Sequence, residues 1–398
     1  MSIADKILAT GKYLNVIKNY DKATQCSFST DLIENHELYL QRQDFSECID
    51  KAFDWANKEL IRIVVKEKNL IDRLSSLKQY FFMEAGDLFI HFLDTAEIEL
   101  KKEVRLISPE KLQSLLEMSI RTSSAEKDAF KDDVYCYLAT GPYSDIINIY
   151  NASLAKTGKD GKPDLSSTTM MISPQPNDLR SKSTTKKGFE FFTLGYEVEW
   201  PLNLILSESN MVYYKLIFKN VFSIRFVELQ LYNCWQLNMT TKSSDLHRSL
   251  TAYCMLLQRM INFVRSVLYS YSCEVIDDHW KNFILNVEHK VKRFDDLLVF
   301  HEDFVQGCVR DTMINDAWFS HKVGQILKVC LIVANYAEKY MNKMKTLEVC
   351  LTDADLAVDA QYEDRRRHGG RRPKLLCVQP GRDKEDGHRK WQNVRLLR

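Results

Sequence analysis

The sequence is poor in the residues that make turns, since its 398 residues include only 13 glycines and 8 prolines. A β-sandwich or barrel needs many turns and would normally use more of both. The net charge of +1 gives no reason to expect nucleic acid as a partner. No apolar stretch approaches the ~20 residues that a membrane-spanning helix needs. These shortages favour a helical globular protein with neither nucleic acid nor a membrane as partner.

Motifs for catalysis and metal binding are also lacking. None of the ten cysteines forms a C-x-x-C pair, which argues against a zinc ribbon or a thioredoxin-like site. Residues 157–163 carry glycines and lysines without phosphate-loop spacing. His301-Glu302 begins like a zinc-protease helix, but Val305 stands where the second histidine must be. We therefore expect no enzyme, with no catalytic residue, no metal site and no cofactor.

The expected compartment is the cytoplasm. The first residues show no basic segment followed by an apolar run, so no signal peptide is visible. Most cysteines fall within apolar helical stretches, where a free thiol behaves as a small hydrophobe. Reduced cysteines are typical of cytosolic proteins.

Helical periodicity covers most of the chain and predicts an all-α fold of antiparallel helical bundles. The expected helices span residues 5–20, 36–66, 68–80, 87–103, 108–121, 211–236, 245–273, 275–290, 294–313 and 317–345. Pro109 suits the first turn of its helix, and Asn210 suits the cap of the helix at 211–236.

The helix expected at 211–236 is apolar on nearly all sides, which is typical of a helix buried among others. Trp200, Phe218, Phe222 and Trp235 lie on it or just before it, and we expect all four in the core.

Three regions depart from the helical pattern. Alternating aromatic residues predict a small β element near 190–200, and residues 134–150 fit either a short strand or an irregular segment. Residues 151–188 are rich in Lys, Ser, Thr, Gly and Pro, which predicts a flexible loop. Residues 346–398 are expected to form a disordered basic tail.

The run from Phe81 to Leu93 surrounds one glycine and one acid with aromatic residues. It predicts a buried helix end, a tight corner at Gly86 and Asp87, and a second apolar helix. Glycine permits backbone conformations denied to other residues, and Asp87 could cap the helix that follows. An ordinary helix–helix junction accounts for the same pattern.

Four segments carry a family resemblance: KILATGKYLN at 6–15, FFMEAGDLFIHFLDTAEIEL at 81–100, KDDVYCYL at 131–138 and GYEVEWPLNLILSESNMVYYKLIFKNVFSIRFVELQLYNCW at 195–235. In order and spacing they resemble the gamma-tubulin complex components, also called grip-motif proteins, over residues 5–345. The resemblance implies a gamma-tubulin-binding component of the gamma-tubulin complex that supports microtubule nucleation. Gamma-tubulin and other complex components are the implied partners. The implied location is the cytoskeleton at a microtubule-organising centre, such as a centrosome or spindle pole.

The resemblance also suggests a division of the chain. Residues 1–80 correspond to the end of an N-terminal grip-type helical region, 81–345 to a C-terminal gamma-tubulin-binding helical domain, and 346–398 to the tail. Most of the N-terminal grip domain has no counterpart here, so we expect gamma-tubulin binding to be retained better than lateral assembly.

The expected gamma-tubulin contacts combine the corner with the segment near 188–200, because large interfaces use aromatic anchors. They are Phe82, Gly86, Asp87, Phe89, Phe192 and Tyr196. The alternative function is a generic helical scaffold or tethering protein without gamma-tubulin binding. The WPL signature at 200–202 favours gamma-tubulin binding over this alternative.

Overall fold

The computed structural model describes residues 3–20, 42–157, 163–174, 187–239 and 244–367. The chain divides into two compact units, residues 1–338 and 339–398. The longer helices are α1 (Ile3–Tyr20), α3 (Arg42–Arg62), α4 (Leu70–Phe81), α5 (Gly86–Lys101), α6 (Pro109–Thr122), α7 (Tyr143–Thr157), α8 (Ser166–Ile172), α10 (Glu208–Met239), α11 (Ser244–Tyr269), α12 (Asp277–His289), α13 (Phe294–Asp311) and α14 (Ala317–Arg367). Short 3₁₀ or π turns lie at η1 (Ile63–Glu67), η2 (Val104–Leu106), η3 (Ser124–Lys127), η4 (Lys131–Asp133), η5 (Gly188–Glu190), η6 (Leu202–Leu204) and η7 (Ser270–Ile276).

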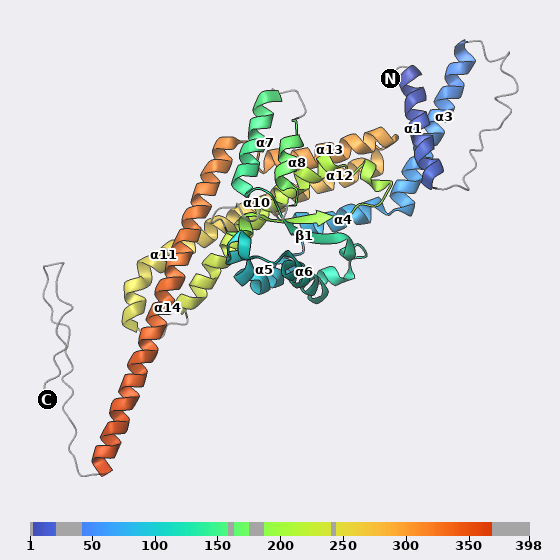
Figure 1. The fold of residues 1–398 in the computed structure, drawn as a ribbon. Coiled ribbons are helices and arrows are strands. Elements are labelled where there is room, and N and C mark those ends of the chain that lie inside the picture. Colours follow the sequence, from blue (N-terminus) through green and yellow to red (C-terminus); the bar gives the residue numbers. More distant parts are fainter. Residues whose placement is uncertain (1–2, 21–41, 158–162, 175–186, 240–243, 368–398) are drawn as a thin grey trace. The chain divides into compact units, whose positions relative to one another are not determined.

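The predicted all-α class is confirmed, and the small β element is present as well (Figure 1). Strand β1 (Val134–Leu138) pairs with β2 (Phe192–Tyr196) as an antiparallel ribbon. The register runs from Val134 opposite Tyr196 to Leu138 opposite Phe192. The aromatic alternation therefore identified β2 correctly, and the segment 134–150 supplies its partner strand.

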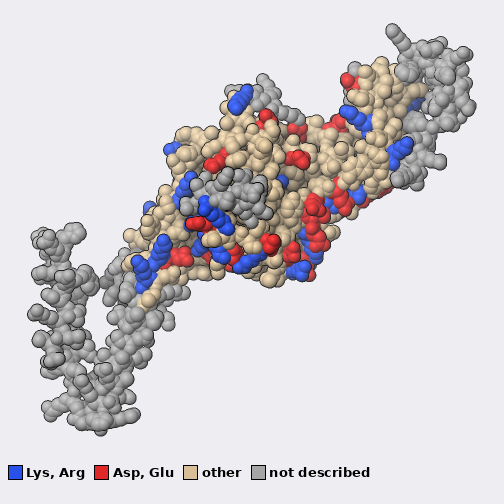
Figure 2. Space-filling view, in the orientation of Figure 1, with Lys and Arg blue, Asp and Glu red and all other residues tan. Residues whose placement is uncertain are grey.

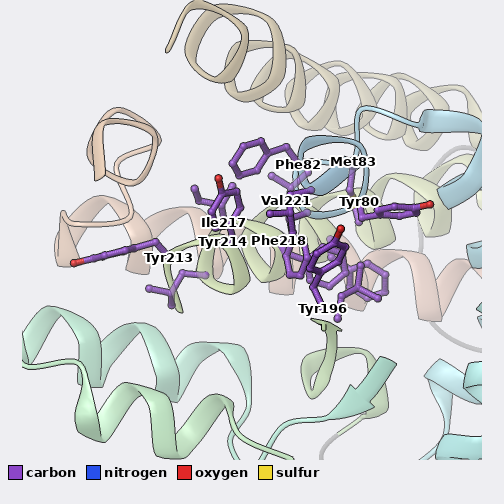
Figure 3. Packing of buried hydrophobic residues seen from close by; sticks show 14 of the residues in the cluster. Tyr80, Phe82, Met83, Tyr196, Tyr213, Tyr214, Ile217, Phe218 and Val221 are labelled. Atoms are coloured by element: carbon purple, nitrogen blue, oxygen red, sulfur yellow. The ribbon is translucent and has the colours of Figure 1, made fainter. Parts of the chain in front are cut away.

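Helix α10 is the centre of the first unit. Helices α4, α7, α8, α11 and α13 and strand β2 all pack against it. Apolar residues surround its axis, so burial on every side removes the most apolar surface from water. In Figure 3, Phe218 and Val221 of α10 lie between Phe82 of the corner and Tyr196 of β2. Phe218 and Phe222 are core residues, as expected.

The two N-terminal helices, α1 and α3, pack on each other and reach the main body through α13. The Tyr13 hydroxyl donates to Asp295 at 2.5 Å. The Asn57 side-chain oxygen accepts the backbone N–H of Phe294 at 3.0 Å, which satisfies a donor in the first turn of α13.

Three expectations about single residues were wrong, wholly or in part. Trp200 is 37% exposed, because the strand β2, which is buried on both faces, ends at Tyr196 and residues 197–200 lie outside it at the surface. Trp235 lies partly buried against the core. Asn210 does not cap α10: the helix begins at Glu208, and the Ser207 hydroxyl accepts the backbone N–H of Asn210 at 3.3 Å.

The expected loop at 151–188 is partly helical. Helix α7 continues to Thr157, and α8 buries Thr168 and Ile172 against its neighbours. Residues 158–162 and 175–186 lie outside the described residues. Helix α14 likewise continues to Arg367, so residues 346–367 are helical where we expected a disordered tail. Residues 368–398 lie outside the described residues.

Among the described residues, every helix is too short or too polar to cross a membrane.

Candidate functional site

The corner between α4 and α5 is built by aromatic packing on α10. Phe81 makes edge contacts with Tyr214 and Phe218, with ring centroids 6.0 Å apart in each case. Phe82 stacks on Tyr214 at 5.3 Å. Met83, with φ of 56°, adopts the left-handed backbone conformation that turns the chain. The corner is therefore fixed by its buried rings and by Met83.

Gly86 does not supply the special backbone conformation that the sequence suggested. It is the first residue of α5, and a Cβ atom placed on it would meet no other atom within 4 Å. Its φ lies outside the left-handed region.

Gly86→Ala is accordingly expected to stabilise the protein by about 0.4–1 kcal/mol, because alanine restricts the unfolded chain without straining the folded one. Urea denaturation of the two proteins measures this difference. A clear loss of stability would show that the corner does require glycine.

Asp87 caps a different helical turn from the one predicted. Its carboxylate accepts the backbone N–H of Ser124 at 2.6 Å and the Ser124 hydroxyl at 2.9 Å. These hydrogen bonds lower the pKa of Asp87. Ser124 opens η3, so Asp87 ties the start of α5 to the turn that follows α6. Asp87 itself is exposed.

The four aromatic residues of the expected site are buried, each at most 7% exposed. Phe89 and Phe192 both lie with their ring centroids 6.1 Å from that of Phe218, while Tyr196 lies at the far end of β2. Aromatic density did not reveal which side of each element faces the core. The structure thus brings Phe82, Phe89 and Phe192 together around α10. All three lie in the core of the first unit and not at its surface.

A buried cation holds the corner to α12. Lys78 of α4 lies 2.9 Å from Glu84 and 2.8 Å from Asp277. Burial alone would lower the pKa of Lys78, but the hydrogen bonds to Asp277 and Glu84 raise it. The ammonium group is therefore charged and paired, which compensates its removal from water.

Sequence reasoning missed the outward side of α5. Ile90 is 52% exposed and Ile98 is 74% exposed, and Asp87, His91 and Asp94 lie exposed on the same side of the helix. We call these five residues the α5 face. Figure 2 shows charged side chains of both signs over the region of α4–α6. The 3.6-residue spacing of 87, 90/91, 94 and 98 is the signal that could have identified this face.

No group of three metal-ligating side chains occurs among the residues that the structure describes.

Two family models match the chain. The gamma tubulin complex component N-terminal model matches residues 1–67, and the C-terminal model matches residues 70–385. The second match extends into the expected tail.

Curated relatives agree with these matches. The chain is similar to mouse gamma-tubulin complex component 2, at 32% identity over 86% of this chain and 36% of the relative. For the Arabidopsis thaliana protein of the same name the identity is 30%, over 83% of this chain and 45% of the relative. Spindle pole body component alp4 of Schizosaccharomyces pombe is 28% identical over 87% of this chain and 49% of its own length. The chain therefore spans about a third to a half of these relatives. It belongs to the gamma-tubulin complex component family.

Proposed function

We propose that this chain binds gamma-tubulin as a component of the gamma-tubulin complex and thereby supports microtubule nucleation. The observation that carries the proposal is the C-terminal family match over residues 70–385, which includes the corner, the ribbon and α10. Its partners are gamma-tubulin and other components of the complex. Relatives named for the gamma-tubulin complex and the spindle pole body support a cytoskeletal location at a centrosome or spindle pole. The protein acts through protein–protein interfaces and not as an enzyme.

We place the gamma-tubulin contact on the α5 face. Exposed Ile90 and Ile98 provide apolar contact area, and acids and a histidine surround them, as in interfaces that combine an apolar core with a polar rim. Of the expected contact residues, Asp87 lies at the start of this face, and Gly86 directly precedes it as the first residue of α5. The buried rings of Phe82, Phe89, Phe192 and Tyr196 act indirectly, because they hold α5 and the ribbon on α10.

Ile90→Glu is expected to weaken co-precipitation with purified gamma-tubulin by at least about tenfold, because a buried charge would replace apolar contact at the interface. The readout is the bound fraction over a gamma-tubulin concentration series. Circular dichroism of the variant checks that the helices remain folded.

The matched control is Leu285→Glu on α12, where Leu285 is 52% exposed as well. It should bind like the unmodified chain. Equal binding by folded Ile90→Glu would move the contact away from the α5 face. A failure of the unmodified chain to bind gamma-tubulin would refute the proposed function itself.

A further inference from the structure

A groove runs between α11 and α14 within the first unit. Its volume is about 360 Å³. Three residues of α11 and four of α14 line it: Arg259, Met260, Phe263, Gln325, Ile326, Val329 and Cys330. Cys330 is buried at the floor, while Phe263, Ile326 and Val329 are 38–52% exposed. We call this feature the α11–α14 groove.

The apolar surface continues beyond the groove on both helices. Met255 and Leu256 lie exposed about two turns before Phe263 on α11. Ile332 and Tyr336 follow Val329 on α14 at helical spacing and are exposed. Single exposed apolar side chains are ordinary, whereas a contiguous set on two neighbouring helices marks an interaction surface.

The charges around this surface have one sign. Residues 251–269 of α11 and 317–337 of α14 contain no Asp or Glu. Arg259 lines the groove, and Lys322 is exposed on α14 one turn before Ile326. Within the described part of the chain, these two side chains make no ion pair, whereas Arg265 lies 2.9 Å from Glu228 of α10. The groove is therefore apolar, with two positive side chains beside it that have no ion-pair partner among the described residues.

We propose that the α11–α14 groove binds an acidic amphipathic helix of a partner protein. A groove between two helices fits a helix that inserts side chains at i, i+3 or i+4, and i+7. Acidic residues beside that apolar stripe would meet Arg259 and Lys322, and complementary charge of this kind selects the partner. The exposed residues from Ile326 to Tyr336 cover about 15 Å along α14, which matches roughly three turns of a bound helix. This binding is additional to the gamma-tubulin contact on the α5 face.

The test uses two synthetic fluorescein-labelled helical peptides with the same leucine stripe, one flanked by glutamates and the other by lysines. Fluorescence anisotropy gives the dissociation constant of each for the full chain. We expect the acidic peptide to bind at least about tenfold more tightly than its basic twin, and its binding to weaken as salt is added.

Two variants locate the binding. Val329→Glu should weaken binding of the acidic peptide by at least about tenfold, and Arg259→Glu should reduce the preference for the acidic peptide over the basic one. Ile90→Glu on the α5 face is the matched control and should bind the acidic peptide like the unmodified chain. Circular dichroism shows whether each variant is folded.

Three results would overturn the proposal: equal binding of the two peptides, no binding of either, or unchanged binding by folded Val329→Glu.

Sedimentation across protein concentrations tests whether a second copy of the chain occupies the groove instead. A dimer that Val329→Glu dissociates would show that it does. Gamma-tubulin co-precipitation by Val329→Glu separates the two proposals. Retained gamma-tubulin binding together with lost peptide binding supports two surfaces, and loss of both would place gamma-tubulin on the groove and overturn the acidic helix as a separate occupant.

Discussion

Phe218→Ala is expected to destabilise the first unit by about 3–5 kcal/mol, the usual cost of truncating a buried phenylalanine. Phe218 is fully buried on α10. Its ring contacts those of Phe81, Phe89, Phe192 and Phe222, with centroids 5.4–6.1 Å apart. Alanine would leave a cavity at the point where α4, α5 and β2 meet α10, and each of those elements would lose part of its packing.

Urea unfolding followed by circular dichroism measures the effect. Phe218→Leu is the conservative control, and its expected cost is smaller, about 1–2 kcal/mol, because most of the apolar volume remains. Met118→Ala, at an exposed position on α6, should change stability by at most about 0.5 kcal/mol. A midpoint for Phe218→Ala equal to that of the unmodified chain would contradict the central place assigned to α10.

Local sequence signals predicted the helical elements well. Pro109 marks the first turn of α6, and Ser108 before it accepts the backbone N–H of Lys111. The all-round apolar pattern of 211–236 identified the buried helix α10. Both signals arise within one element, since the spacing of apolar side chains and the chemistry of helix ends depend on neighbouring residues only.

The features that sequence reasoning missed depend on contacts between distant residues. Asp87 bonds Ser124, which lies 37 positions along the chain, so its own helix gave no sign of that partner. Helix α8 lies in a polar segment and is short, but it packs against α7 and α10. Packing of this kind overrides weak local preference.

The end of α14 shows a different limit. Apolar periodicity fades after residue 345, yet residues 346–367 contain neither glycine nor proline. Gly369-Gly370 is the first strong helix-breaking signal after that stretch. A helix can therefore continue past the point where its apolar stripe ends, and apolar periodicity alone placed the end too early.

The candidate site shows the same difference between local sequence signals and contacts made by distant residues. The sequence located the corner and the ribbon, but not which side of each faces solvent. Phe89 and Ile90 are adjacent in the chain, and one is buried while the other is 52% exposed. Only the position of α10 decides between them, and that position is set by the whole unit.

Lys219 is the second residue for which we expect a large effect. It is buried in α10, and its amine donates to the backbone oxygens of Glu190 at 3.3 Å and Phe192 at 3.2 Å. Burial lowers its pKa from 10.5 to about 7. A neutral amine has two N–H groups, which match these two carbonyl oxygens. Lys219 therefore joins α10 to η5 and β2, and its burial favours the uncharged amine.

The pH dependence follows from the two pKa values of Lys219. Between about pH 7 and pH 10.5 the unfolded chain holds a proton on this amine that the folded chain has released, so the contribution of Lys219 to the unfolding free energy rises with pH. At ~1.36 kcal/mol per pH unit, the gain from about pH 7 to pH 9 is roughly 2–3 kcal/mol. Buried cysteines act in the opposite direction at the upper end of this range, because burial raises the pKa of Cys136 and Cys308 to about 12.

Comparison with Lys219→Met separates the lysine from the cysteines, because both proteins contain the same thiols. We expect the unfolding free energy of the unmodified chain, minus that of Lys219→Met, to rise by roughly 2–3 kcal/mol between about pH 7 and pH 9. Urea unfolding at the two pH values gives this difference, and Lys12→Met, at an exposed position of α1, should give none. A difference for Lys219→Met that does not change with pH would mean that the amine keeps its proton in the folded protein, and the link between α10 and the ribbon would then rest on a charged lysine.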